Sequence, residues 1–289
     1  MRAKVTTLFC LCLLLTAAAP GSAGTGKYYI VGMGTAPDLL TIRGAEVIKR
    51  ADVILVGDKS DGETWKKYIG NKEVWYCPNS LRSMYGIDPR TIADPARRAL
   101  AEKNAQARKE LADKIRAAVE GGRIVAHLQS ADPMMFGLTF LLEMLPKELP
   151  SEIVPGIGSY QAAAAAVKMS PPYGYDTNGV ILTAADWPGR LDTNEKLMTP
   201  GSTMVFYTMH LDYPALFSQL QRHYAADTPV AVVIDAGDRI REKVVRSTVG
   251  RFLQDVDYKN LPPERELLFV GKFLTAGQAR KTLVIERGK

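Results

Sequence analysis

The sequence predicts an α/β protein of two domains, with a mostly parallel N-terminal sheet and a mixed C-terminal sheet. Up to residue 169, short apolar runs alternate with helical patterns, which is typical of β-α-β units. Beyond residue 180 the apolar runs are rich in β-branched residues and are less often separated by helices. Because 46% of the 289 residues are apolar, the chain is able to bury a full core.

The elements of the first half follow from local patterns. KYYIVGMG is a β-rich apolar run that ends in glycines, and the segment after it has apolar residues at helical spacing. An Ala-, Arg-, Lys- and Glu-rich stretch with almost no Gly or Pro predicts a long solvent-facing helix. In chain order we expect strand 27–34, helix 39–51, strand 52–58, helix 94–120, strand 123–128, strand 152–156 and helix 159–169.

The stretch SADP, residues 130–133, interrupts two apolar runs and allows two interpretations. Residues 123–128 predict a strand, and the apolar spacing after Pro133 predicts a helix. The loop between them is a candidate binding loop, because ligands of open α/β sheets lie at the carboxyl ends of strands. The alternative is an ordinary turn in which Asp132 caps the helix and Pro133 occupies its first position.

The second half begins after SPPYGYDTNG, a stretch dense in turn residues. Five β-rich runs and one amphipathic helix, 213–225, predict a mixed sheet with a helix packed on it. The runs are GVILTA, STMVFYTM, PVAVVIDA, VVRSTVG and ELLFVGKF. We therefore expect an N-terminal domain at residues 24–169, a linker at 170–179 and a C-terminal domain at 180–289.

The first 23 residues have the layout of a secretory signal peptide. Arg2 and Lys4 precede LFCLCLLLTAAA, and small residues follow up to an expected cleavage site after Ala23. The apolar run is too short for a comfortable membrane span. We expect an exported protein with no membrane span after cleavage; a retained N-terminal anchor is the alternative.

Charge and cysteine content exclude several classes of function. Residues 1–23 hold two of the 37 Lys and Arg and none of the 31 Asp and Glu, so cleavage leaves a net charge of +4. This charge suits an acidic small molecule and is too weak to indicate nucleic acid. Cys77 would be the one remaining cysteine, and His127, His210 and His223 lack ligand spacing, so we expect no metal site.

The order of the motifs resembles the tetrapyrrole methylases, the family of the uroporphyrinogen and precorrin methyltransferases. The resemblance rests on strand–GMGTAPDLLT–helix, strand–LQSADPMMFG–helix, strand–VPGIGSYQAAAA, STMVFYTM and TPVAVVIDA in this order. It covers about residues 28–287. It implies a two-domain fold, often dimeric, that holds S-adenosylmethionine in the cleft between the domains. The substrate that the resemblance implies is a polycarboxylate tetrapyrrole.

Carried over by position, the family's cofactor-binding segments fall on five stretches of this chain. The first is the glycine turn after the first strand, and the second is SADP. The third follows Pro155-Gly156, the fourth corresponds to the family's Y-M-G loop, and the fifth follows the next strand. The residues that the resemblance assigns to the cofactor are Gly32, Gly34, Thr35, Ser130, Ala131, Asp132, Gly158, Ser159, Thr208, Met209 and Ala236.

The chain departs from the family pattern in these same segments. The usual first turn reads G-x-G-P-G-D-P, whereas this chain has GMGTAP, and Ala36 and Ala131 stand where glycine is common. His127 replaces a common arginine, and the Y-M-G order is lost. Since glycine permits close approach and positive φ, these changes reshape the cleft. The alternative to a methyltransferase is thus an exported, catalytically silent ligand-binding protein with the same fold.

Two further assignments concern chemistry. Methyl transfer from a sulfonium needs alignment and exclusion of water, and a general base would remove the proton from the methylated carbon. Asp58 is our candidate base, because the family often has an Asp one position earlier; the alternative is a loop-end cap. Four arginines allow two interpretations, as binding partners of substrate carboxylates or as solvated surface charge. They are Arg82, Arg90, Arg97 and Arg98.

Overall fold

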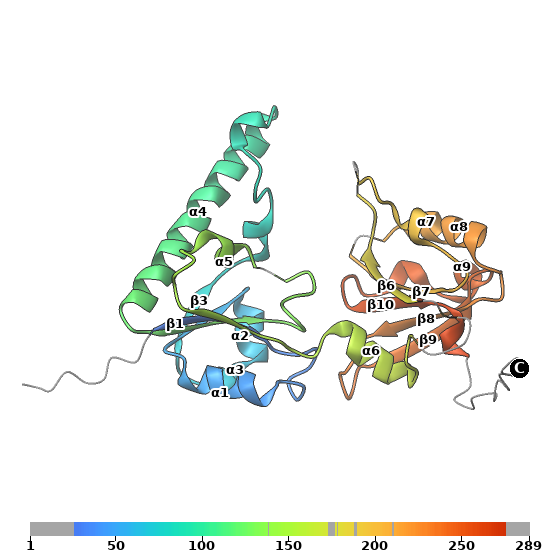
Figure 1. Ribbon diagram of the computed structural model, residues 1–289, viewed down its shortest axis with the longest axis horizontal. Helices are drawn as coiled ribbons and strands as arrows, with labels where there is room; N and C mark the ends of the chain where they lie inside the picture. The colour runs from blue at the N-terminus through green and yellow to red at the C-terminus, as the bar shows by residue number, and fades with distance from the viewer. Residues whose placement is uncertain are drawn as a thin grey trace, which may run out of the picture.

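The computed structural model describes residues 26–137, 139–172, 177, 179–187, 190–209 and 211–275. Within them the chain forms two five-stranded sheets that lie beside each other (Figure 1). The predicted signal peptide and half of the predicted linker lie outside the described residues. The limits proposed for the two domains therefore remain sequence-based expectations.

The first sheet is parallel throughout and has the order β3-β2-β4-β1-β5. Its central strands are apolar on both faces, as expected for a parallel sheet that is covered on each side. The expected strands at 27–34, 52–58, 123–128 and 152–156 are all present. The strands are β1 (Lys27–Gly32), β2 (Val53–Val56), β3 (Glu73–Tyr76), β4 (Ile124–Gln129) and β5 (Ser151–Val154).

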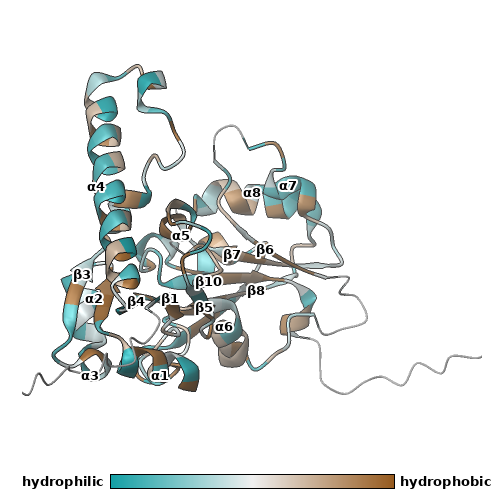
Figure 2. Cartoon of the chain, turned by 60° about the vertical axis from the view of Figure 1, so that its left-hand side comes forward, coloured by the Kyte–Doolittle hydropathy of each residue, from teal (hydrophilic) through white to brown (hydrophobic). Residues whose placement is uncertain are grey.

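Helices cover both faces of this sheet. Tyr28 and Ile30 of β1 point to the face covered by α4, and Tyr29 and Val31 point to the face covered by α1. The 26-residue helix α4 was expected as a long, solvent-facing helix, and Figure 2 shows hydrophilic residues along most of its length. The helices of this half are α1 (Ile42–Arg50), α2 (Lys59–Thr64), α3 (Lys66–Ile69), α4 (Pro95–Glu120) and α5 (Phe140–Met144), with 3-10 turns η1 (Asn79–Arg82) and η2 (Pro89–Thr91).

The segment after β4 differs from the expectation of strand, tight turn and helix. Residues 133–136 form a turn, and the helix α5 begins only at Phe140. Asp132 accepts a hydrogen bond from the Met134 N–H at 2.9 Å, so it caps this turn and not a helix. Phe136 has φ +63°, a left-handed conformation that a helix cannot continue through. The predicted capping role of Asp132 in a helix was therefore wrong.

The second sheet is mixed, as expected, with the order β6-β7-β10-β8-β9. Strands β6 and β7 are parallel, and the other neighbours are antiparallel. All five predicted β-rich runs are strands of this sheet. They are β6 (Gly179–Ala184), β7 (Ser202–Tyr207), β8 (Pro229–Ile234), β9 (Lys243–Thr248) and β10 (Glu266–Val270).

Helices also cover both faces of the second sheet. Leu216 and Phe217 of α8 pack with Phe206 on one face, and Ala163 and Val167 of α6 pack with the opposite face (Figure 1). Helix α6 follows the last strand of the first sheet, yet it packs on the second. The remaining elements are α6 (Ser159–Val167), α7 (Asn194–Leu197), α8 (Tyr213–His223), α9 (Phe252–Asp255), η3 (Tyr258–Asn260) and η4 (Lys272–Leu274).

No helix within the described residues is both long enough and apolar enough to cross a bilayer.

Candidate functional site

Three loops leave the first sheet at one edge, because β4, β1 and β5 are parallel neighbours. Gly32 pairs in register with Gln129, and Val31 pairs with Val154, so the strands end at the same level. The loops that follow are residues 32–36, 130–133 and 155–159, which we call the cleft loops. The carboxyl edge of a parallel sheet is where α/β proteins bind ligands.

The cleft loops are joined to one another through their backbones. The Ala131 N–H donates to the Gly34 carbonyl at 2.8 Å, and the Gly34 N–H donates to the Ala131 carbonyl at 3.2 Å. A Cβ added to Gly32 would lie 2.4 Å from the Gly156 nitrogen, and one added to Gly156 would lie 2.2 Å from the Ala131 oxygen. Since real Cβ contacts are never this short, glycine is required at both positions for the loops to meet.

Ala131 adopts φ +58°, a conformation that favours glycine. From the sequence, an alanine here was expected to reshape the cleft. The backbone instead keeps the left-handed conformation of a glycine turn, and the two hydrogen bonds to Gly34 hold it there. The substitution thus leaves strain in the loop and adds a methyl group at its surface.

The second sheet and the segments that follow it contact the first half beside the cleft loops. The ring of Phe136 meets the ring of Tyr207 edge-on, with centroids 5.1 Å apart. Burial, with a contribution from the Asp132 carboxylate, raises the pKa of Tyr207 to about 12, so its hydroxyl stays protonated. Asp38, just after the first cleft loop, forms an ion pair with Arg239 of the second half. These contacts bring the two sheets together at the cleft loops.

One polar group in the cleft lacks a partner. The Thr35 hydroxyl oxygen is buried and makes no hydrogen bond within the described chain. Across from it lies Gly237, with φ +87°, where a Cβ would come within 2.5 Å of that oxygen and 2.7 Å of Leu39 Cδ1. An unpaired buried hydroxyl is costly, so its presence is typical of a site where a ligand completes the hydrogen bond.

The structure brings together the sequence-predicted cofactor residues of the first half, whereas the Thr208 side chain lines a separate cavity on the α8 face of the second sheet. Those of the N-terminal half lie in the cleft loops: Gly32, Gly34, Thr35, Ser130, Ala131, Asp132, Gly158 and Ser159. Those of the second half follow two strands that are separated by β10: Thr208 and Met209 come after β7, and Ala236 comes after β8 and next to Gly237. Their individual roles in cofactor binding stay predictions.

Asp58 lies away from these residues and forms hydrogen bonds within its own loop. It follows β2, which is separated from β1 by β4, and it caps α2. Its Oδ1 accepts from the Ser60 N–H and hydroxyl, each at 2.7 Å, and from the Asp61 N–H at 3.0 Å. These hydrogen bonds lower the pKa of Asp58, which makes it a weaker base. The geometry therefore favours the capping interpretation over the catalytic one.

The four predicted substrate arginines differ in their contacts. Arg82 donates to the Phe136 carbonyl at 3.0 Å and so braces the turn that meets Tyr207. Arg90 pairs with Asp88 at 2.6 Å, and Arg98 donates to the Ile92 carbonyl at 2.9 Å. Arg97 is exposed on α4. Of the four arginines, Arg82 alone contacts the turn that follows the second cleft loop.

The histidines that the structure describes have structural partners. Nδ1 of the buried His127 lies 2.9 Å from the Tyr28 hydroxyl, and burial lowers the pKa of His127 to about 3, so the ring is neutral. His223 pairs with Glu195 at 3.1 Å, and His210 lies outside the described residues. No group of three or more potential metal ligands occurs in the described part of the chain.

Sequence reasoning missed several residues that shape the cleft, namely Asp38, Phe136, Gly237 and Arg239. Asp38 and Arg239 are 201 residues apart in the chain, and each looks like ordinary surface charge in its local sequence. Gly237 sits directly after a predicted cofactor residue, and this proximity was the one signal available for it.

The protein has loops and close-packed glycines at the edge of one sheet, and a second sheet faces them. This arrangement is typical of α/β enzymes that bind a nucleoside-containing cofactor. Comparison with known proteins gives the family. The model of the Tetrapyrrole (Corrin/Porphyrin) Methylases matches residues 27–253. The chain belongs to this family, as the motif order indicated, and tetrapyrrole methylases use S-adenosylmethionine.

Individual relatives agree with this assignment. The chain is 29% identical over 232 residues to a cobalt-precorrin-4 C(11)-methyltransferase of Priestia megaterium, covering 77% of this chain and 79% of that protein. It is 26% identical over 282 residues to a siroheme synthase of Hydrogenovibrio crunogenus, covering 91% of this chain. It spans about half of the siroheme synthase, 52% of its length.

Solved structures show the same fold. A cobalt precorrin-4 methyltransferase matches with a TM-score of 0.63 and 25% identity, covering 86% of this chain and 95% of that one. A uroporphyrin-III C-methyl transferase from Thermus thermophilus, solved in complex with S-adenyl homocysteine, matches with a TM-score of 0.62 and 19% identity, covering 87% and 100%.

The residues of the cleft fit the family's cofactor. The unpaired Thr35 hydroxyl offers a hydrogen bond to a polar ligand, and the Gly237 backbone packs too close to Thr35 and Leu39 to carry a side chain. The joined loops provide a preformed wall, so a bound donor would meet a surface that is already ordered.

Proposed function

We propose that this protein transfers a methyl group from S-adenosylmethionine to a carbon of a tetrapyrrole. The observation that carries the proposal is the buried, unpartnered Thr35 hydroxyl among the cleft loops of a tetrapyrrole methylase. A methyl donor in this cleft would give that hydroxyl its missing partner. A cleft of apolar side chains and backbone groups also suits a reaction in which the sulfonium charge disappears.

Donor binding is tested by isothermal titration of the full chain with S-adenosylmethionine and S-adenosylhomocysteine. The informative variant is Thr35→Val, which keeps the shape and removes the hydroxyl. Without ligand, the variant should be slightly more stable than the wild type, because it no longer buries an unpaired polar group. Its affinity for the donor should fall about tenfold, the value of one well-made hydrogen bond in a buried site.

The control is Thr248→Val, on β9 and away from the cleft, which should leave donor affinity unchanged. Opposite effects of Thr35→Val on stability and on affinity are expected only if the hydroxyl serves a ligand. A donor affinity that is unaltered in Thr35→Val would remove Thr35 from the site. If no binding is detected up to about millimolar S-adenosylmethionine, the proposal that this protein is a methyltransferase is refuted.

The acceptor is tested by following S-adenosylhomocysteine formation with a panel of tetrapyrroles. The relatives named above suggest the first two candidates, uroporphyrinogen III and cobalt-precorrin-4. We expect one ring system of this class to support turnover. Asp58→Asn should retain most of the activity, since Asp58 is held as a cap with a lowered pKa. A loss of more than about a thousandfold would restore Asp58 as the general base.

We further propose that the protein is exported with cleavage after Ala23 and acts as a homodimer. The support for export is the signal-like pattern of residues 1–23. N-terminal sequencing of the native protein tests it, because a start at Gly24 and a start at Met1 are distinct outcomes. Sedimentation equilibrium tests the dimer. None of the comparisons supports the alternative of a catalytically silent binding protein.

A further inference from the structure

A cavity of about 420 Å³ lies in the second half of the chain, away from the interdomain cleft. Its walls are apolar and aromatic, its ionisable side chains include three carboxyl groups and one ammonium, and three hydroxyl groups also line it. The lining residues are Thr208, Leu211, Asp212, Tyr213, Pro214, Tyr258, Lys259, Leu261, Pro263, Glu264 and Glu266. A cavity of this size holds a small organic molecule.

The cavity and the cleft lie on opposite faces of the second sheet. Along β7, Phe206 packs with α8, whereas Tyr207 packs with the α6 side and meets Phe136 of the cleft. Side chains alternate along a strand, so Thr208 points to the α8 face. Along β10, Leu268 packs on the α8 face, and Glu266 shares that face by the same alternation. A molecule in this cavity is thus separated from a donor in the cleft by the backbone after β7.

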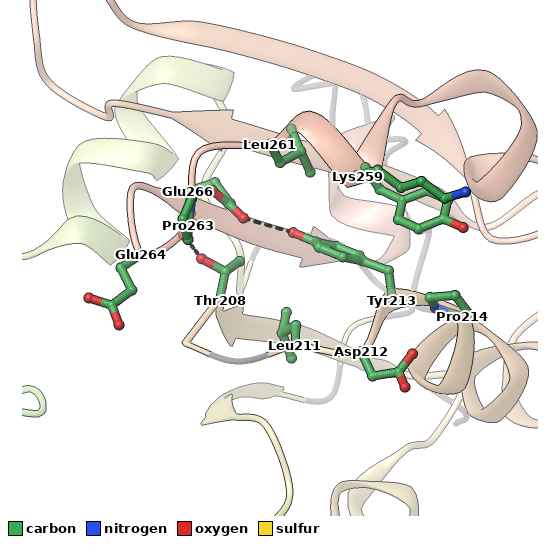
Figure 3. A pocket seen from close by; sticks show the side chains of 11 residues that line it. Thr208, Leu211, Asp212, Tyr213, Pro214, Lys259, Leu261, Pro263, Glu264 and Glu266 are labelled. Atoms are coloured by element: carbon green, nitrogen blue, oxygen red, sulfur yellow. Dashed lines mark hydrogen bonds between the residues drawn. The ribbon is translucent and has the colours of Figure 1, made fainter.

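Glu266 is the functional group of the cavity. Its Oε1 accepts a hydrogen bond from the Tyr213 hydroxyl at 3.2 Å, and Figure 3 shows the two side chains pointing toward each other. Its Oε2 is buried and has no partner among the described residues. A carboxylate normally accepts several hydrogen bonds, so the ionised form of Glu266 is poorly satisfied. Burial accordingly raises the pKa of Glu266 to about 7.

The charged residues around Glu266 do not supply a partner for its Oε2. Arg265 is engaged in an ion pair with Asp235 at 2.5 Å. From the other elements, Asp212 caps α8 through the Ala215 N–H, Glu264 is exposed, and Lys259 of η3 is the one cation that lines the cavity. The cavity thus has a negative balance and tyrosine walls, a combination that attracts an organic cation.

From this arrangement we propose that the cavity binds a small organic cation, with an ammonium group paired to the Glu266 carboxylate and an apolar body between Leu211 and Leu261. The proposal does not depend on the methyl-transfer activity. It assigns to this face of the second sheet a ligand site of its own, placed directly behind the backbone of Thr208.

The test is isothermal titration of the full chain with benzylamine, and with benzyl alcohol as the neutral molecule of the same shape. We expect saturable 1:1 binding of benzylamine and at least tenfold weaker binding of the alcohol, because a charge-assisted hydrogen bond is lost. Glu266→Gln should weaken benzylamine by about tenfold. Glu148→Gln, an exposed carboxyl on the other half, is the matched control and should have no effect.

The pH dependence provides a second measurement on the unmodified protein. An alkylammonium stays protonated between pH 6 and pH 8, whereas the carboxylate fraction of Glu266 rises from about a tenth to about nine tenths. Benzylamine affinity should therefore increase about tenfold over this range in the wild type and stay constant in Glu266→Gln. A pH profile needs no variant, so a folding defect of Glu266→Gln does not affect it.

Three results would overturn the proposal. The first is the absence of saturable benzylamine binding up to about 10 mM at pH 8. The second is equal affinity for amine and alcohol. The third is competition between benzylamine and S-adenosylhomocysteine, which would assign the cavity to the donor site. Independent binding of benzylamine and S-adenosylhomocysteine supports a separate site. If benzylamine binds and S-adenosylhomocysteine does not, the result contradicts the proposed function and leaves the cation site supported.

Discussion

Replacing Glu266 by Gln should stabilise the protein at alkaline pH and leave it unchanged at acid pH. The pKa of Glu266 is raised from 4.5 to about 7 in the folded chain. Folding therefore favours the protonated form. The stability that this group contributes is fully present below pH 4.5 and is lost as the pH rises to about 7. Glutamine stays neutral throughout, so the variant avoids this loss.

The magnitude follows from the pKa difference. A pKa shift of one unit corresponds to about 1.4 kcal/mol. The shift of Glu266 from 4.5 to about 7 therefore limits the stabilisation by Glu266→Gln to about 3.4 kcal/mol. Glu266 is only half buried and water screens part of the penalty, so we expect about 1–2 kcal/mol. Urea unfolding of both proteins at pH 5 and pH 8 measures this gain, as a difference in free energy of unfolding between variant and wild type that is several times larger at pH 8 than at pH 5. A difference that is equal at both pH values would refute the reasoning.

Three other substitutions test the packing around the cleft and the core. Ala131→Gly should raise the thermal unfolding midpoint or leave it unchanged, because removing about 1–2 kcal/mol of left-handed strain outweighs about 0.4–1 kcal/mol of added backbone entropy; a clear drop would contradict it. Gly156→Ala should cost at least about 2 kcal/mol in urea unfolding, since its Cβ would lie 2.2 Å from a carbonyl oxygen; wild-type stability would show that the loops separate freely. Tyr28→Phe should cost about 1–3 kcal/mol by leaving the buried His127 nitrogen unpaired, and an unchanged midpoint would mean that water replaces the hydroxyl.

Local pattern was sufficient for most of the fold. All strands except β3 (Glu73–Tyr76) were predicted, because burial on both faces leaves continuous apolar runs, and α4 was predicted because a long Ala- and Arg-rich stretch has no helix breaker. The segment after Pro133 was predicted wrongly as a continuous helix. Its apolar spacing is helical, but the left-handed conformation of Phe136 ends the turn, and a tertiary contact with Tyr207 holds that ring in place.

The sequence by itself determined the family, the order of the elements and the segments that carry the cofactor motifs. Those properties depend on short contiguous stretches, and their order and spacing can be compared with the family pattern from the sequence of one chain. Tertiary structure alone decided that Asp38 meets Arg239, that Gly237 faces Thr35, and that Glu266 lies half buried with an unpaired oxygen. Each of these depends on residues far apart in the chain, whose burial and partners exist only after the two sheets have packed together.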